Sequence, residues 1–555
     1  MTTGQPASSD FDVIVVGAGY SGLYLLHRLR AQGRRVRVLE AGDGVGGTWY
    51  WNRYPGARCD VESVEYGFSF SAELDERWRW SERYSAQPDI LAYLNTVADT
   101  FDLRPDIQLN TTVTSATYDE SAHRWRLRTR PSGVTDSADT DSGGAGGGEE
   151  LTAQFCVMAT GCLSKPKVPD IAGLDSFAGP SYFTSSWPHE GVDFTGQRVG
   201  VIGTGSSGVQ AIPLIAEQAA HLHVFQRTAN YIVPAHNHEL SEHDQAAEKL
   251  ATRRRSGLDC PLGVAFEPAE VNAVPAMELS AEEREAEFER LWRRGGLVMM
   301  LAFPDLLLEG EANRAAAEFL ESKIRAKVHD PAVAEILTPK GYPVGSKRLC
   351  VDTNYYETFN RDNVSLVDLT ATPIDRVTPA GVLTSAGEVP LDALVLATGF
   401  DAMTGALGAI DIRGRDGVPL SRRWADGPRS LLGLAVAGFP NLFTVTGPGS
   451  PSVLSNMRLS IEQHVDWITD CLAYLAEHGI AAIEATEGAQ ESWVAHAAEV
   501  AEPTVFPRGS SWYTGTNVPG KPRVFMPYIG GVPAYREACE KVAAEGYQGF
   551  ELTRA

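Results

Sequence analysis

FDVIVVGAGYSG, residues 11–22, decides the fold of this chain. Its first half, Phe11–Val16, is a short β-branched run typical of a buried strand, and a helix-like stretch with leucines on one face follows at 20–32. A second apolar run at 36–39 ends at Glu40. A strand, a glycine turn, a helix and a second strand in this order predict a dinucleotide-binding unit.

The glycines of this turn have separate tasks. Gly17 permits a tight turn, Gly19 lets the backbone approach a pyrophosphate, and Gly22 allows close packing of the helix. The N-terminus of the helix stabilises phosphates, and Glu40 can accept hydrogen bonds from ribose hydroxyls. An acid at this position favours an unphosphorylated ribose, as in FAD or NAD.

A second copy of the pattern begins at Arg198. Its glycine cluster contains Gly203, Gly205, Ser206 and Gly208. The second strand of this copy ends without an acid, and Arg227 with Thr228 follows. An arginine at this point pairs with the 2′-phosphate of NADP, which a carboxylate would repel. The two copies together predict a flavin that is reduced by NADPH.

We therefore predict an α/β protein with two Rossmann-like dinucleotide-binding domains, one for FAD and one for NADP. An Ala-, Glu- and Arg-rich stretch, in which Ser280 and Glu283 form a capping box, predicts a helical insertion in the NADP domain. The expected division is an FAD domain at 1–165 and 390–555, an NADP domain at 166–240 and 335–389, and the insertion at 241–334.

Composition excludes several classes of function. Asp and Glu number 71 against 48 Lys and Arg, so the formal net charge of the 555 residues is −23, which would repel nucleic acids and anionic membranes. We find no apolar run of about 18 residues and no leader-like start. The seven cysteines are scattered, as in reducing compartments. We expect a soluble, cytoplasmic protein with neither nucleic-acid nor membrane partners; its oligomeric state is left open.

Three further features of the sequence do not indicate a functional site. Residues 131–150 are rich in Gly, Ser, Asp and Thr and predict an acidic surface loop. His236 and His238 lack a third ligand nearby, so we expect no metal site. Cys156 and Cys162 are five residues apart without a C-x-x-C pattern, which disfavours a disulfide reductase.

One segment makes the prediction specific. Gly46–Asp60 reads GGTWYWNRYPGARCD and resembles the G-G-x-W-x(4)-Y-P-G-x(3)-D element of Baeyer-Villiger monooxygenases. Residues 177–188 resemble the linker motif of that family, F-x-G-x(3)-H-x(3)-W-P, with Phe183 in place of the histidine. The family histidine is considered important for the interdomain response to NADP, so its loss puts coupling efficiency in doubt. The resemblance continues at 347–352, 392–405, 438–457 and 512–522 and covers nearly the whole chain.

The resemblance implies roles for individual residues. Arg348 matches the catalytic arginine and Asp60 the carboxylate that orients it. Cofactor contacts are implied for Gly47, Thr48 and Trp49 within the first element, for Lys347, Arg227 and Thr228 at the 2′-phosphate, and for Trp512 at the nicotinamide-side ribose. The amino-acid sequence at 447–457 most resembles that of members which act on aryl, steroid and other bulky ketones. The resemblance also places Val453, Leu454 and Met457 at the substrate pocket.

The implied chemistry is the insertion of one oxygen atom beside a ketone. NADPH reduces the flavin, oxygen converts it to a C4a-peroxyflavin, and the anionic peroxide attacks the ketone to give an ester or lactone plus water. Arg348 remains cationic at working pH and can stabilise both the peroxide and the developing alkoxide. Retained NADP⁺ protects the intermediate from loss of hydrogen peroxide.

Two alternatives remain. Heteroatom oxygenation of amines or sulfides would use the same cofactors, although the Arg348 and Asp60 pair argues against it as the main activity. A non-catalytic flavoprotein that acts as a redox sensor or through a partner is kept open by Phe183.

Overall fold

The computed structural model describes residues 10–133, 148–246, 249 and 272–554. The first dinucleotide unit forms as predicted: β1 (Phe11–Val16), α1 (Tyr20–Ala31) and β2 (Val36–Leu39) follow one another, and the two strands pair in parallel with Val13 opposite Val36. Both strands are largely buried, because a parallel sheet is covered on both faces.

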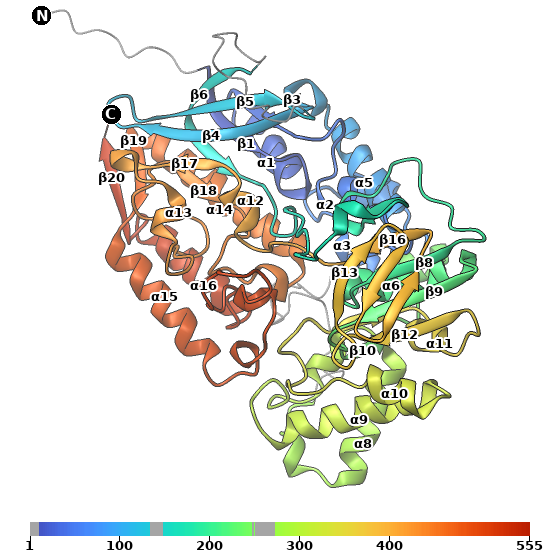
Figure 1. Cartoon of the computed structure of the whole chain (residues 1–555). Coiled ribbons are helices and arrows are strands. Elements are labelled where there is room, and N and C mark those ends of the chain that lie inside the picture. The colour runs from blue at the N-terminus through green and yellow to red at the C-terminus, as the bar shows by residue number, and fades with distance from the viewer. Residues whose placement is uncertain (1–9, 134–147, 247–248, 250–271, 555) are drawn as a thin grey trace, which may run out of the picture.

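The first sheet joins the two ends of the chain. Its order is β17-β4-β5-β6-β1-β2-β3, and β18 pairs with β6. The added strands are β3 (Ile107–Gln108), β4 (Thr111–Asp119), β5 (Arg124–Pro131), β6 (Glu150–Met158), β17 (Asp411–Arg413) and β18 (Leu442–Thr444). Elements from both ends of the colour scale therefore lie in one body in Figure 1. Most of the predicted acidic loop, residues 134–147, lies outside the described residues.

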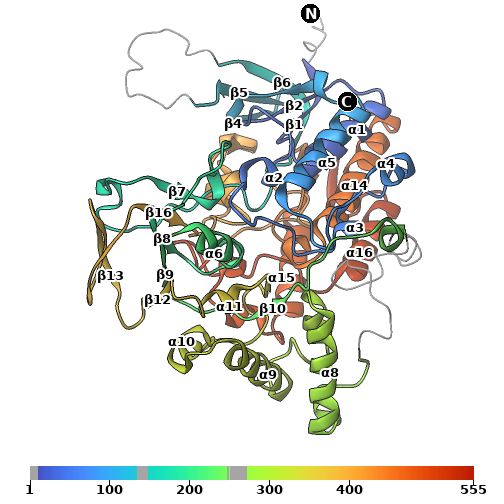
Figure 2. The same ribbon diagram turned by 90° about the vertical axis from the view of Figure 1, so that its right-hand side faces the viewer.

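Helices from distant parts of the sequence cover this sheet. α1 packs against α5 (Gln87–Thr100) and against the long α14 (Met457–Glu477), and Figure 2 shows the three beside each other. Their contact buries a large apolar core that includes Leu23, Leu94 and Ile468. α14 begins at Met457 because the side chain of Asn456 caps its first turn.

The second unit repeats the first. A parallel sheet has the order β12-β9-β8-β16-β7, and its glycine turn lies between β8 and α6. The bounds are β7 (Ser181–Phe183), β8 (Arg198–Ile202), α6 (Ser206–Gln218), β9 (His221–Gln226), β12 (Val364–Asp368) and β16 (Ala393–Leu396). A hairpin sheet of β13 (Ile374–Thr378), β14 (Gly381–Thr384) and β15 (Gly387–Pro390) adjoins it.

The predicted insertion is helical. α8 (Ala281–Arg294) begins with the predicted capping box, and α9 (Glu311–Lys327) packs against it. α10 (Pro331–Leu337) runs across the predicted end of the insertion at 334. These helices form the lower part of the molecule in Figure 1. Strands β10 (Ile232–Pro234) and β11 (Cys350–Asp352) pair in parallel and connect the helices to the second sheet.

The remaining elements are short or terminal. They are α2 (Thr48–Trp51), α3 (Ser63–Tyr66), α4 (Ala72–Arg77), α11 (Tyr355–Thr358), α12 (Gly405–Gly408), α13 (Leu420–Arg423), α15 (Glu487–Ala501), α16 (Val532–Ala544), β19 (Ile480–Ala485) and β20 (Phe550–Arg554). None of the helices in the described ranges is long and apolar enough to cross a membrane.

Candidate functional site

The two glycine turns have nearly the same geometry. A Cβ on Gly22 would lie 1.9 Å from the carbonyl oxygen of Gly17, and a Cβ on Gly208 would lie 2.3 Å from that of Gly203. Gly17 and Gly203 both have positive φ angles. Gly17 lies against Ala159 and Gly203 lies against Ala397, each just past the end of a neighbouring strand. The turns thus bring the backbone of each helix start against its strand, as the sequence predicts.

The starts of α1 and α6 offer free backbone donors. Their N-caps are Gly19 and Gly205, and neither helix start carries a side-chain cap or an acidic residue in the first turn. The space beside Gly205 is open to 4 Å. Uncapped N–H groups at a helix N-terminus bind phosphate oxygens. Both turns therefore fit a pyrophosphate.

Glu40 lies where the first unit requires a ribose partner. Its carboxylate is buried and accepts the N–H of Ala18 at 2.7 Å and that of Gly42 at 2.8 Å. Burial raises the pKa of Glu40, although these amides act in the opposite direction. Each carboxylate oxygen has a second lone pair for a ribose hydroxyl.

The GGTW segment packs against the first glycine turn. A Cβ on Gly47 would lie 2.9 Å from Cα of Gly19. The next two residues, Thr48 and Trp49, begin α2; Thr48 is exposed, while Trp49 is buried and donates to the Tyr66 hydroxyl at 3.2 Å. The structure thus brings Gly47 beside Gly19, and Thr48 and Trp49 follow it at the start of α2.

Three cations gather at the end of the second unit. Arg227 follows β9, and its charge contributes, after burial, to lowering the pKa of both Lys347 and Lys167. Lys347 also lies over the ring of Tyr342, 4.5 Å from its centroid. Thr228 adjoins the cluster and its carbonyl accepts a bond from Thr204. Like charges held together in this way fit a phosphate dianion. Lys167 was not predicted, because no motif marks it.

Arg348 and Asp60 form the predicted pair. Nε and Nη2 of Arg348 donate to the two oxygens of Asp60 at 2.7 and 2.8 Å, and Nη1 donates to the carbonyl oxygen of Val453 at 2.6 Å. Each side chain is 22% exposed. Burial acts to lower the pKa of Arg348, but Asp60 and Tyr513 outweigh it and raise this pKa further, so the cation is permanent.

A pocket lies beside this pair. Asp60, Arg348 and Tyr513 are on its wall, together with Glu62, Tyr84 and Arg294. Its apolar lining comes from the residue after Asp60, from the insertion and from the segment after β18, and includes Val61, Leu297, Val298, Met300, Val453 and Leu454. A mostly apolar pocket with a few convergent polar groups is typical of a small-molecule site. Met457 is not on this wall; it starts α14 and packs against the same apolar cluster.

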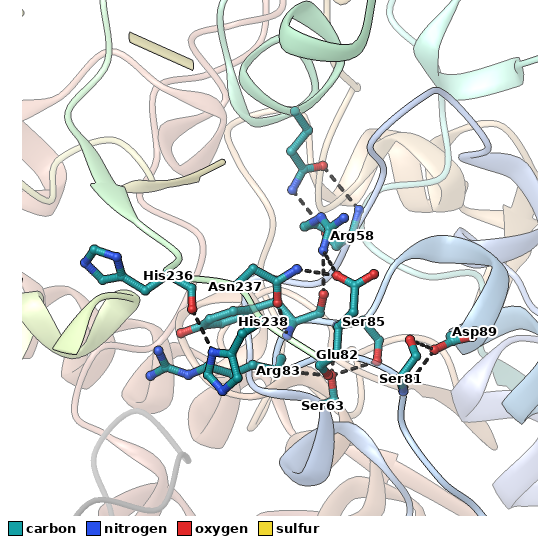
Figure 3. A network of polar contacts seen from close by, with 12 residues as sticks. Arg58, Ser63, Ser81, Glu82, Arg83, Ser85, Asp89, His236, Asn237 and His238 are labelled. Carbon is teal, nitrogen blue, oxygen red and sulfur yellow. Dashed lines mark hydrogen bonds and ion pairs between the residues drawn. The ribbon is translucent and has the colours of Figure 1, made fainter. Parts of the chain in front are cut away.

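A polar network holds the segment that carries Asp60. Arg58 donates to Glu82 at 2.6 Å and to the carbonyl oxygen of Tyr84 at 2.8 Å, and Asn237 donates to Glu82 and accepts the N–H of Tyr84 at 2.9 Å. Figure 3 shows Asn237 and Arg58 converging on Glu82. The second unit thus fixes the first at the base of the pocket.

Replacing Asn237 with alanine tests this network. The change leaves the Tyr84 N–H without its acceptor and removes one of the two donors to Glu82, so we expect a loss of about 1–3 kcal/mol in the free energy of unfolding. It should also lower product yield per NADPH, because Asp60 is less firmly placed. Denaturant unfolding and product analysis measure both. Asn95→Ala, which removes a bond within α5, is the control; equal stability and yield in the two variants would contradict the role of Asn237.

Other predicted residues have distinct surroundings. Phe183 ends β7 and packs against the apolar cluster of the second sheet. Trp512 starts a short turn and packs against the cluster that surrounds the pocket. Ser206 starts α6 with its hydroxyl 3.5 Å from the Cys350 sulfur. His236 and His238 interact with backbone carbonyls, and no group of three metal-binding side chains occurs among the described residues.

Comparison with known proteins identifies the family. The model of the NAD(P)-binding Rossmann-like domain matches residues 15–82. A Baeyer-Villiger monooxygenase of Pseudooceanicola batsensis is 43% identical, with 98% of this chain and 96% of that protein covered. The chain belongs to the Baeyer-Villiger monooxygenase family. Family membership explains why the GGTW element, Arg348 and the cation cluster occur together in one chain.

Further relatives show the range of the family. A phenazine N-monooxygenase of Lysobacter antibioticus is 42% identical over 98% of this chain and 97% of that protein. A solved steroid monooxygenase bound to NADP is 51% identical with a TM-score of 0.90, over 98% of this chain and all of that one. The OTEMO complex with FAD and NADP is 40% identical with a TM-score of 0.91 and the same coverage.

Proposed function

We propose that this Baeyer-Villiger monooxygenase converts a ketone, O₂, NADPH and a proton into an ester or lactone, NADP⁺ and water. The observation that carries the proposal is the bidentate Arg348–Asp60 pair on the wall of a mostly apolar pocket. A permanent cation in such a pocket stabilises negative charge that develops as oxygen adds to a carbonyl.

Both cofactors fit the chain. We propose that FAD lies on the first unit, with its pyrophosphate at Gly17, Gly19 and Gly22 and a ribose at Glu40. NADP lies on the second, with its pyrophosphate at the start of α6 and its 2′-phosphate among Arg227, Lys347 and Lys167. When bound, the pair supplies hydride transfer and the activation of O₂. Trp512 is proposed to contact the nicotinamide-side ribose.

The side chains of the pocket are proposed to have separate roles. Asp60 holds the guanidinium of Arg348 in one plane through two bonds, and the Val453 carbonyl holds a third N–H. Of the two remaining N–H groups, one faces Tyr513 and the other is available to the carbonyl oxygen of the ketone. Apolar residues such as Val453 and Leu454 exclude water, which strengthens these interactions.

A panel of cyclic, aryl, aliphatic and steroidal ketones tests the function. With purified flavin-loaded protein, we expect at least one ketone to raise NADPH and O₂ consumption and to yield a product heavier by one oxygen atom, measured by mass spectrometry. If every ketone leaves NADPH consumption unchanged and no ester forms, the proposal is wrong.

A second candidate is oxygenation of nitrogen or sulfur. It is favoured by the 42% identity to a phenazine N-monooxygenase. Matched pairs of ketone and thioether or aromatic amine distinguish the two: we expect the ester to dominate, because attack on a carbonyl develops the negative charge that Arg348 stabilises. A larger turnover with the heteroatom substrates would favour the second candidate.

Two organisational features are also proposed. The FAD domain comprises the first sheet with its C-terminal strands, and the NADP domain comprises the second sheet with the helices around α8 and α9; this division is supported by the pairing of β18 with β6. We propose a cytoplasmic location, which the free, buried cysteines of the described chain support.

A further inference from the structure

Tyr513 is a polar side chain of the pocket that lies in the family-like stretch 512–522 but to which the resemblance gave no role. It stands in a short turn beside Trp512 and is only 2% exposed. Its ring packs against Phe506, with centroids 6.0 Å apart, and against Phe525. Its hydroxyl lies close enough to the guanidinium of Arg348 for each group to influence the pKa of the other, and both residues line the pocket. The ring is thus fixed while its polar end reaches the reactive part of the wall.

The hydroxyl proton of Tyr513 takes no part in the contact of this residue with Arg348. Three of the five N–H groups of the guanidinium donate to Asp60 and Val453. An arginine only donates, so the side of Tyr513 that faces the guanidinium is its oxygen and not its proton. Among residues 10–133, 148–246, 249 and 272–554, no acceptor is found for the hydroxyl proton of Tyr513. Burial raises the pKa of Tyr513, so the proton is present at working pH.

We propose that Tyr513 is a catalytic residue that donates its hydroxyl proton, as a hydrogen bond, to the carbonyl oxygen of the bound ketone. Together with an N–H of Arg348 it forms a two-donor site for the negative charge that builds on this oxygen during addition. The Arg348 cation polarises the hydroxyl and strengthens its donation. No proton is transferred: the bond shortens as charge develops and relaxes when the carbonyl re-forms. The inference rests on the proposed ketone oxygenation.

Tyr513→Phe keeps the ring and removes only the donor. Loss of one donor to a developing oxyanion typically costs about 100-fold in kcat, so we expect a fall of this size in ester formation, with hydrogen peroxide released instead. Flavin reduction by NADPH should keep its wild-type rate, because Tyr513 acts only on the ketone. The variant should lose less with electron-poor aryl ketones than with electron-rich ones, a trend that a purely structural role would not produce.

A second measurement does not depend on turnover. The ¹³C resonance of a carbonyl-labelled ketone moves downfield when its oxygen accepts a hydrogen bond, so this shift should be smaller in Tyr513→Phe than in the wild type. Tyr474→Phe is the matched control, since Tyr474 lies in the last turn of α14, about 25 Å along the helix from Met457.

The outcomes separate the two proposals. Ester formation within about twofold of the wild type, with an unchanged ¹³C shift, overturns the role of Tyr513. A wild-type protein that makes no ester overturns the proposed function instead, and the ¹³C shift of a bound ketone then still decides whether Tyr513 donates to its carbonyl.

Discussion

Arg348→Ala is expected to reduce ester formation by about 1000-fold, at the upper end of the range for a single donor to a developing oxyanion. The guanidinium is the permanent charge on the pocket wall, and its loss also frees Asp60 from two bonds. NADPH oxidation should continue, with hydrogen peroxide as the product. Product analysis and peroxide detection under matched NADPH consumption measure the change. Ester formation within tenfold of the wild type would contradict the assigned role.

The unpaired Asp60 complicates this variant, and a second substitution removes the complication. A mostly buried carboxylate without its partner destabilises a protein by up to about 3–5 kcal/mol. Arg348→Ala combined with Asp60→Asn should recover thermal stability without recovering ester formation. Arg348→Lys retains the charge but not the fork, so we expect intermediate activity. A stable double variant that is still inactive shows that the loss is chemical.

Arg227→Asp should raise the KM for NADPH by about 100-fold, because a charged hydrogen bond to the 2′-phosphate, worth about 1.5–3 kcal/mol, is replaced by repulsion. The KM for NADH should change little, since NADH lacks this phosphate. Initial rates with both nucleotides measure the ratio.

Substitutions of the other two cations of the cluster should have smaller effects on NADPH binding. Lys347 and Lys167 lie close enough to Arg227 for its charge to lower their pKa values, so Lys167→Ala should weaken NADPH binding in the same direction but less. Arg376→Asp, on the hairpin strand β13, is the control. Equal increases in KM for NADH and NADPH after Arg227→Asp would place the phosphate elsewhere.

The nucleotide-binding units could be predicted from sequence because their determinants are local. Gly17, Gly22 and Glu40 act within two strands, one turn and one helix, so their spacing carries the information. Gly203 and Gly208 repeat it. The same reasoning located the start of α8, because the capping box at Ser280 is complete within four residues.

The pairing of Arg348 with Asp60 was predicted from the resemblance. Arg348 and Asp60 are 288 residues apart, and a spacing argument cannot join them. Once the family motifs are recognised, both are found at their expected place. Met457 shows the limit of such transfer, since it lies in the expected segment but not on the pocket wall.

The sequence by itself determined two dinucleotide-binding units and their opposite charges at Glu40 and Arg227. It also indicated the class of reaction. Tertiary structure alone decided which side chains surround that chemistry. Lys167 and Asn237 lie outside the motifs and Tyr513 received no role from its motif, and each contacts a distant segment. The physical reason is the separation of the residues along the sequence. A phosphate-binding turn is formed by neighbouring residues, whereas the pocket beside Arg348 is formed where the two units and the helical insertion meet.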